Sequence, residues 1–474
     1  MPNRQPIVAI LGHVDHGKTT LLDYIRKSHR AEGELGGITQ STGAYQAEFK
    51  KKKLTFIDTP GHAAFRRMRS RGVSTADVAV LVVAADDGVK PQTLESIKHI
   101  QEAKIPFVVA ITKVDKPGVS VDVAKAGLTQ AEVFVEGYGG NTPVVAVSAK
   151  SGEGIESLLE NILLLAELEE LPYSPDNTLE APIIESHKDG KIGISVSIIV
   201  KAGTLKVGGE LYTRTATGKV QRLENDRGEV VRELKPGEPG RIMGFSELPA
   251  VGEIVSDKPV TVEATGVETQ GEGEEKPMVE NKLKIILRAD SVGSLEAVGA
   301  SLTEEVQIIS QGVGNVSESD VLLARSTGAL LFGFSVKAST SVLKLAEVEG
   351  VVVKTFGIIY ELLEYIEKKV MKILEPTIDE EELGRATILK VFEINRDRIA
   401  GCRVESGVIS VGDTVHVKRG DVTKEARIRG MRIGKNEVKK AETGAECGVL
   451  FSTNLDIDMK DVIISYKKIK TDEE

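Results

Sequence analysis

The stretch PIVAILGHVDHGKTT (residues 6–20) runs from an apolar, β-branched segment directly into a glycine-rich turn. Its centre, GHVDHGKT (12–19), fits the phosphate-loop pattern G-x-x-x-x-G-K-[ST]. Gly12 and Gly17 would let backbone N–H groups surround a phosphate at the N-terminus of the following helix. Lys18 would bridge the β and γ oxygens, and the Thr19 hydroxyl would hold Mg²⁺. The residues expected to contact the nucleotide here are Gly12, His13, Val14, Asp15, His16, Gly17, Lys18, Thr19 and Thr20.

Three later segments complete a guanine-nucleotide site. In IDTPG (57–61), Asp58 ends a buried strand and can hold a magnesium-bound water, while the Gly61 N–H can reach a γ-phosphate. In TKVD (112–115), the Asp115 carboxylate can accept the N1–H and N2–H of guanine, a donor pair that adenine lacks. The backbone of SAK (148–150) would contact guanine O6. The motifs together predict GTP over ATP, with further contacts at Thr59, Pro60, His62, Thr112, Lys113, Val114, Ser148, Ala149 and Lys150.

Thr39 lies in GELGGITQS (33–41), between the phosphate loop and Asp58. This is the interval in which a switch loop closes on Mg²⁺, and glycines at 36 and 37 give the freedom for an order–disorder transition. The predicted magnesium ligands are therefore Thr19, Thr39 and Asp58.

Buried-strand candidates follow the phosphate loop at intervals, separated by amphipathic helical stretches. Strands are expected at 54–58, 78–85, 106–112 and 143–149, and helices at 93–104 and 154–171. Strand and helix in alternation predict a parallel sheet covered on both faces. We expect a P-loop GTPase domain over residues 1–172.

The rest of the chain changes pattern four times, so the expected fold class is multidomain, with α/β and β domains. Short, glycine-punctuated strands over 180–262 predict an antiparallel β-barrel, and 263–281 reads as an acidic, flexible linker. Residues 282–357 predict a small layered α/β domain, and 358–376 a connecting helix. A second antiparallel barrel is expected over 383–470, where Lys and Arg outnumber Asp and Glu.

Two patterns bear on how these parts are built. The helix carries an apolar stripe at Ile359, Leu362, Ile366, Val370 and Ile373, and it either packs on its own domain or connects domains. The hairpin pattern Gly-x-(Leu/Ile)-x-Val-Gly occurs in both 202–211 and 406–415 and favours two similar barrels.

Composition excludes several classes of protein. With 474 residues, 41% of them hydrophobic, the chain is too long to form a single core. Its net charge of −10 excludes a generally basic nucleic-acid-binding protein. Two cysteines cannot make a disulfide framework. A signal peptide, a transit segment and a long apolar run are absent from the sequence, so we expect a cytoplasmic protein without a membrane anchor.

The chain resembles a translational GTPase in the segments GHVDHGKTT, GGITQ and DTPGH. It resembles, more narrowly, bacterial translation initiation factor two in the segments GGITQSTGAYQ, DTPGHAAFRRMRSRG and VVAADDGVKPQT. LKIILRADSVGSLEAV (283–298) and IAGCRVESGVISVGD (399–413) agree, and the resemblance covers residues 6 to about 466, without the family's long N-terminal extension. It implies a monomeric GTPase that carries formyl-methionyl initiator tRNA on the small ribosomal subunit and promotes joining of the large subunit. Ribosome-triggered GTP hydrolysis would release it.

The resemblance also implies roles near the γ-phosphate. His62 would align the attacking water beside Gly61, and Val14 and Ile38 would form an apolar gate until large-subunit RNA moves the imidazole inward. Because the sequence shows no candidate arginine finger, we expect hydrolysis to be slow without the ribosome. Asp15 would help bind a monovalent cation, whereas the other two histidines of the loop would shape it.

In the last barrel, the resemblance points to an initiator-tRNA pocket at Cys402, Arg429, Arg432, Glu446, Cys447 and Gly448. The other interpretation of the two cysteines is that they are small buried hydrophobes. The family usually has a basic-basic-aromatic-basic run before this pocket, but here Gly430 and Met431 stand inside it. Thr112 stands where asparagine is usual, and its hydroxyl could still tie the turn to the phosphate loop.

Two other functions remain open. One is a different translational GTPase that delivers a specialised elongator tRNA, and the other is an RNA-binding scaffold that uses GTP only as a structural ligand. The run KKKK (50–53) is expected at a solvated hairpin tip, with a ribosome contact as the alternative.

Overall fold

The computed structural model describes residues 3–27, 39–40, 42–173, 177–190, 192–259, 282–374, 380–394, 397–419, 422–434, 436–453, 455 and 457–468. The chain forms two compact units, Met1–Glu367 and Lys368–Glu474. Two predicted features, Ile38 and the linker at 263–281, lie outside the described residues. Among the described helices, none has the length and apolar character needed to cross a bilayer.

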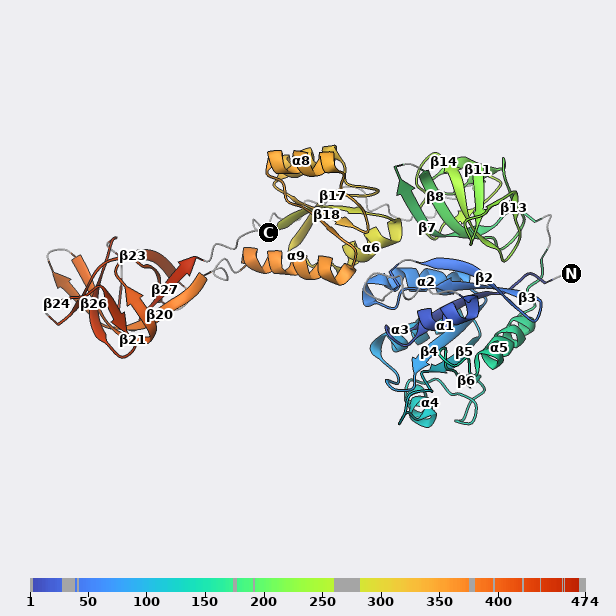
Figure 1. Cartoon of the computed structure of the whole chain (residues 1–474), viewed down its shortest axis with the longest axis horizontal. Helices are drawn as coiled ribbons and strands as arrows, with labels where there is room; N and C mark the ends of the chain where they lie inside the picture. Colours follow the sequence, from blue (N-terminus) through green and yellow to red (C-terminus); the bar gives the residue numbers. More distant parts are fainter. Residues whose placement is uncertain are drawn as a thin grey trace. The chain divides into compact units, whose positions relative to one another are not determined.

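The first domain is built on a six-stranded sheet of order β2-β3-β1-β4-β5-β6 (Figure 1). Its strands are β1 (Ile7–Gly12), β2 (Gly43–Phe49), β3 (Lys52–Asp58), β4 (Val78–Ala84), β5 (Phe107–Thr112) and β6 (Val144–Ala146). All neighbours are parallel except β2 and β3. The predicted strands are therefore confirmed, with an antiparallel edge strand added.

Helices cover both faces of this sheet, as expected for fully buried parallel strands. Two of them, α1 (Lys18–Arg26) and α5 (Ile155–Leu168), share one core with β1 through Leu21 and Leu158. The other face holds α2 (Arg66–Thr75), α3 (Pro91–Ala103) and α4 (Val121–Gln130). A short 3₁₀ helix, η2 (Ala63–Phe65), precedes α2.

The lysine run does form a hairpin tip. Lys50 and Lys51 both have positive φ, which makes the tight turn between β2 and β3. Lys50 pairs with Glu160 and Lys52 with Glu167, both on α5. These ion pairs give the lysines a local role within the domain.

The second domain is a barrel of short antiparallel strands. They are β7 (Ala181–Asp189), β8 (Gly193–Ile199), β9 (Leu205–Lys206), β10 (Glu210–Tyr212), β11 (Thr217–Asn225), β12 (Val230–Val231), β13 (Glu233–Leu234), β14 (Pro239–Phe245) and β15 (Ile254–Val255). The main sheet runs β10-β11-β14-β8-β7-β15. Paired backbone bonds of 2.9 Å between Tyr212 and Ser256 join its two ends.

The third domain has four parallel strands in the order β17-β16-β18-β19. They are β16 (Leu283–Ala289), β17 (Val306–Val313), β18 (Leu330–Phe334) and β19 (Val353–Phe356), connected by α6 (Val292–Ser301), α7 (Glu318–Thr327) and α8 (Thr340–Glu349). Leu331 of β18 packs with α7 and α8, whereas Phe332 meets Tyr365 of α9 (Ile359–Leu374). Because adjacent strand residues point to opposite faces, the first turns of α9 cover the opposite face from α7 and α8.

Apolar and polar contacts join the three domains of the first unit, and Ile184 and Ile199 of the second domain pack in one cluster with Ile7 and Ile57 of the first. Arg71 of α2 makes a two-pronged ion pair with Glu296 of α6, at 2.9 and 2.6 Å. The buried Glu185 of β7 accepts the backbone N–H of Gly293 in the first turn of α6, at 3.0 Å. A Cβ on Gly293 would lie 2.4 Å from Met68 Cε and 2.5 Å from Glu185 Oε2, so a larger residue there would displace one of these two side chains.

The second unit contains a closed antiparallel barrel of order β20-β27-β22-β23-β26-β21, in which β21 pairs back with β20. Its strands are β20 (Glu380–Ile394), β21 (Asp397–Ser410), β22 (Thr414–Arg419), β23 (Val422–Ile433), β24 (Asn436–Glu437), β25 (Lys440–Glu442), β26 (Glu446–Phe451) and β27 (Val462–Lys468). The repeated hairpin pattern places Gly208 and Gly412 at equivalent turns, both with positive φ. The predicted fold class, α/β and β domains with two antiparallel barrels, is confirmed.

Candidate nucleotide-binding site

The predicted site residues converge at the carboxyl ends of the parallel strands, where ligands bind in open α/β sheets. The phosphate loop follows β1, Asp58 ends β3, Thr112 ends β5 and Ser148 follows β6. Residues of these four segments line a cavity of about 360 Å³. Its lining is Val14, Asp15, Gly17, Lys18, Thr19, Thr20, Thr39, Gly61, His62, Thr112, Lys113, Asp115, Lys116, Ala149 and Lys150.

Gly12 and Gly17 of the phosphate loop both have positive φ, but they serve different purposes. Gly12 has φ 148°, and a Cβ there would lie 2.4 Å from the Val82 carbonyl oxygen. Gly17 has φ 84° and is the N-cap of α1, with no side chain to accept the first-turn N–H groups. Those N–H groups and the helix dipole can therefore serve an anion.

Lys18 is a buried cation at the same point. Its Nζ donates to the carbonyl oxygens of Gly12 at 3.0 Å and His13 at 2.6 Å. Burial lowers the pKa of Lys18 to about 8, although the nearby carboxylate of Asp58 acts in the opposite direction. A lysine held this way supplies a positive charge that a phosphate can use without first stripping a large hydration shell.

Two of the three predicted magnesium ligands are in contact. The hydroxyl oxygens of Thr19 and Thr39 are 2.8 Å apart, and Asp58 is buried at the end of β3. Hydroxyl, carboxylate and phosphate oxygens are the donors that Mg²⁺ prefers. The three residues thus fit the ion chemically.

On the opposite side of the cavity, Asp115 is oriented by a neighbour. Ser148 donates its hydroxyl proton to Asp115 Oδ1 at 2.7 Å, and this bond lowers the pKa of Asp115. Asp115 lines the cavity together with Lys113 and Lys116. Thr112 donates to the His16 carbonyl at 2.6 Å, so the threonine ties this turn to the phosphate loop.

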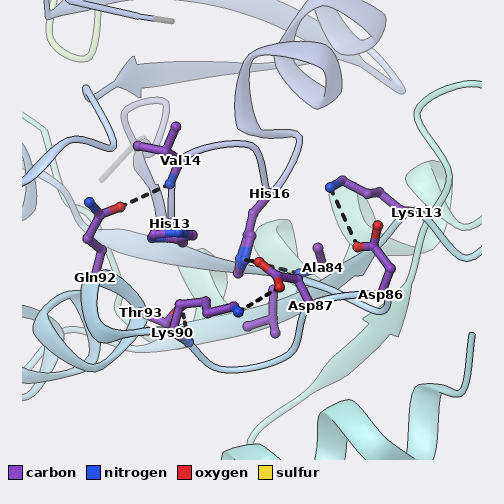
Figure 2. Close-up of polar contacts among 12 residues, drawn as sticks. His13, Val14, His16, Ala84, Asp86, Asp87, Lys90, Gln92, Thr93 and Lys113 are labelled. Atoms are coloured by element: carbon purple, nitrogen blue, oxygen red, sulfur yellow. Dashed lines mark hydrogen bonds and ion pairs between the residues drawn. The ribbon is translucent and has the colours of Figure 1, made fainter. Parts of the chain in front are cut away.

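Figure 2 shows the contacts between the phosphate loop and residues in and just before the first turn of α3. Gln92, in the first turn of α3, accepts the Val14 N–H at 3.0 Å. The His16 ring is fully buried, with Nε2 3.4 Å from Asp87, and burial lowers its pKa to about 4. Lys90 in turn pairs with Asp87 at 2.7 Å. His16 is therefore a neutral support of the loop at physiological pH.

His62 lines the cavity beside Gly61. Its Nδ1 accepts the Ala64 N–H at 2.9 Å, which assigns the proton of the neutral ring to Nε2. Burial, and then the charge of Arg69, lower the pKa of His62. The fully buried Arg69 donates to the carbonyls of Pro60 and His62 and pairs with Glu95 at 2.9 Å. The imidazole can thus donate from Nε2 toward a water or a phosphoryl oxygen.

Some predicted contacts lie behind the cavity wall. His13, His16, Thr59 and Ser148 support the loops, with Thr59 Oγ1 donating to the Ile10 carbonyl at 2.8 Å. Gly12, Asp58, Pro60 and Val114 are likewise outside the lining. Sequence reasoning missed Lys116, which lines the cavity next to Asp115, and the support from Gln92. The position of Lys116 directly after TKVD was the available signal.

The candidate tRNA residues divide between the inside and the outside of the last barrel. Cys402 and Cys447 face each other across β21 and β26, with sulfurs 3.6 Å apart in the core. Arg429, Arg432 and Glu446 are exposed, and Glu446 pairs with Arg403 at 2.7 Å. The burial of both thiols favours the structural interpretation of the cysteines. Gly448, next to Cys447 on β26, is half-exposed and pairs with Arg432 of β23.

Family models match four successive parts of the chain. Residues 3–167 match the elongation factor Tu GTP-binding domain, and residues 178–258 match elongation factor G domain 2. Residues 260–367 match translation-initiation factor 2, and residues 397–454 match elongation factor Tu domain 2. The site described above lies within the first of these matches.

Curated relatives match this chain over nearly all of its length. A protein of Campylobacter fetus named translation initiation factor IF-2 is 41% identical over 99% of this chain and 59% of its own length. Proteins of the same name from Petrotoga mobilis and onion yellows phytoplasma are 40% and 38% identical, with 71% and 81% of their lengths covered. The chain thus spans little more than half the length of some of the curated relatives it matches. From the loop motifs to the last barrel, the chain belongs to the translation initiation factor IF-2 family.

Proposed function

We propose that this chain is a guanine-nucleotide switch of translation initiation that hydrolyses GTP to GDP and phosphate when the assembled ribosome triggers it. One cavity brings together a buried lysine, a threonine pair, an oriented carboxylate and a histidine. Phosphoryl transfer asks mainly for such positioning and charge. Lys18 and the loop amides would hold the phosphates, and Thr19, Thr39 and Asp58 would hold Mg²⁺.

The observation that carries guanine specificity is the Ser148–Asp115 bond of 2.7 Å. It fixes a carboxylate that can accept two parallel N–H groups from guanine. Adenine offers no such pair, so ATP would leave Asp115 without its partners.

Calorimetry on the whole chain tests this specificity. The unchanged protein should bind GTP and show no ATP binding. Asp115→Asn should weaken GTP binding about 10- to 100-fold, because a charge-assisted pair is lost, and should bind xanthosine triphosphate, whose C2 oxygen can accept from the new amide. Asp122→Asn, on α4 outside the cavity, is the matched control. Equal affinity for GTP and ATP, or no change in Asp115→Asn, would reject the assignment.

The partner side of the proposal is that the chain carries formyl-methionyl initiator tRNA on the small subunit and promotes joining of the large subunit, working as a monomer in the cytoplasm. Arg429 and Arg432 are exposed on β23, and Arg432 pairs in register with the half-exposed Gly448 of β26, so neighbouring strands of the last barrel offer cationic side chains and accessible backbone. A formylated amine carries no ammonium charge, so it avoids the desolvation cost of a free aminoacyl group.

Competition between formyl-methionyl and methionyl initiator tRNA for the whole chain separates the alternatives. Tighter binding of the formylated form supports this proposal. A preference for an unformylated elongator tRNA would identify a different translational GTPase. Binding of GTP without any ribosome-stimulated phosphate release would identify a scaffold that uses GTP as a structural ligand.

A further inference from the structure

The start of α9 contacts two segments of the nucleotide site, at Gln40 and at His62. Gln40 directly follows Thr39, and its side-chain amide donates to the Gly357 carbonyl at 2.8 Å. Its amide oxygen accepts the Ile359 N–H at 3.0 Å. These two bonds fix the start of the helix against a residue more than 300 positions earlier in the chain.

Tyr360, the next residue, lies against the His62 imidazole. The ring centroids are 4.2 Å apart at an interplanar angle of 81°, an edge-to-face contact slightly closer than the usual range of about 4.5–7 Å. Burial, and then the negative charge of Asp15, raise the pKa of Tyr360. Two sides of the imidazole are therefore engaged, one by Tyr360 and the Nδ1 edge by Ala64.

Neither partner of the ring lines the nucleotide cavity, which includes His62 itself. A shift of the imidazole toward the phosphates would break its ring contact with Tyr360, a group that takes no part in the reaction. Any energy that this contact contributes to the resting position is added to the barrier for hydrolysis.

We propose that Tyr360 is a positioning residue that holds His62 in its resting orientation and slows GTP hydrolysis until the first turn of α9 moves. The inference rests on the proposed GTPase function. It differs from an apolar gate in the phosphate loop, because the restraint comes from the third domain. The Gln40 bonds place the tyrosine, and Gln40 adjoins a predicted magnesium ligand, so closing of Thr39 on Mg²⁺ and release of the ring would be linked.

Single-turnover GTP hydrolysis without ribosomes tests the restraint. Tyr360→Ala should raise the rate about 2- to 12-fold, the range that an edge-to-face pair of ~0.5–1.5 kcal/mol gives at 1.36 kcal/mol per tenfold. The rise should appear in the maximal single-turnover rate constant, with no change in the concentration that gives half of that rate. Tyr360→Phe, which keeps the ring, should match the unchanged protein. Phe134→Ala truncates another half-exposed aromatic outside the cavity and is the control.

The double variant His62→Ala/Tyr360→Ala shows whether the effect acts through the imidazole. It should hydrolyse GTP no faster than His62→Ala alone. A rate in Tyr360→Ala that is unchanged or lower, or a gain that persists without His62, would overturn the inference. Tyr360→Leu keeps apolar volume without the ring and serves if the alanine variant does not fold.

These outcomes are separate from failure of the proposed function. If the unchanged chain binds no GTP, or if ribosomes do not accelerate phosphate release, the proposed function fails. If both are normal and Tyr360→Ala behaves as the unchanged chain, only the restraint is rejected.

Discussion

At the scale of single residues, the nitrogen assignment of His62 limits its chemistry. Because Nδ1 accepts from Ala64, the neutral ring presents a donor and not a base at Nε2. Burial and Arg69 lower the pKa of His62, which keeps the neutral form dominant at physiological pH. The ring is thus suited to holding a water or a developing oxyanion and not to removing a proton.

His62→Ala should keep GTP affinity and lose most ribosome-stimulated hydrolysis, by about 10³-fold if the ring supplies charge stabilisation comparable to an arginine finger. His62→Gln, which keeps a side-chain N–H donor, should fall between the two. Stopped-flow phosphate release on ribosomes measures all three. Stimulated hydrolysis at the normal rate in His62→Ala would remove the residue from the mechanism.

At the scale of elements, the strand pair β21–β26 decides the environment of the cysteines. Both thiols point into the barrel core, at 1% and 4% exposure. A thiol reagent added to the native protein should therefore react slowly, and denaturant should release two reactive thiols per chain. Rapid reaction of both thiols in the folded protein would place them at the surface, as a tRNA pocket built from their side chains requires.

The contact between β7 and α6 should make stability depend on pH. Burial raises the pKa of Glu185 to about 7, despite the N–H bonds from Gly293 and Ser186, and Asp290 acts in the same direction. The folded state then holds a proton that the unfolded state releases near pH 4.5. This contribution is complete below about pH 4.5 and is lost as the pH rises through about 7, by up to ~3 kcal/mol.

Glu185→Gln keeps a carbonyl oxygen for Gly293 without the charge, so its stability should change less between pH 5 and 8 than that of the unchanged protein. Chemical denaturation at several pH values compares the two. Glu180→Gln, with the same substitution on an exposed side chain, controls for the loss of one carboxylate. Parallel pH curves for all three proteins would show that Glu185 is not protonated in the fold.

At the scale of the whole molecule, the features that could be predicted are those formed by continuous stretches of sequence. The phosphate loop, the four strand ends and the stripe on α9 are continuous patterns, and the structure has the corresponding elements. The strand at 43–49, GAYQAEF, was missed because its half-exposed alternation lacks an apolar run. The contacts of Gln40 and Tyr360 with the nucleotide site join residues some 300 positions apart and leave no local pattern. The inward direction of the two thiols depends likewise on barrel closure.

The molecule combines a complete nucleotide cavity with a histidine held by structural contacts, so hydrolysis should depend on an outside trigger. The most direct measurement is single-turnover phosphate release from the GTP-loaded chain, with and without ribosomes carrying initiator tRNA. We predict slow release alone and an acceleration of about 10³-fold or more on the ribosome. Equal rates in the two conditions, or a chain that binds no GTP, would contradict a ribosome-triggered switch.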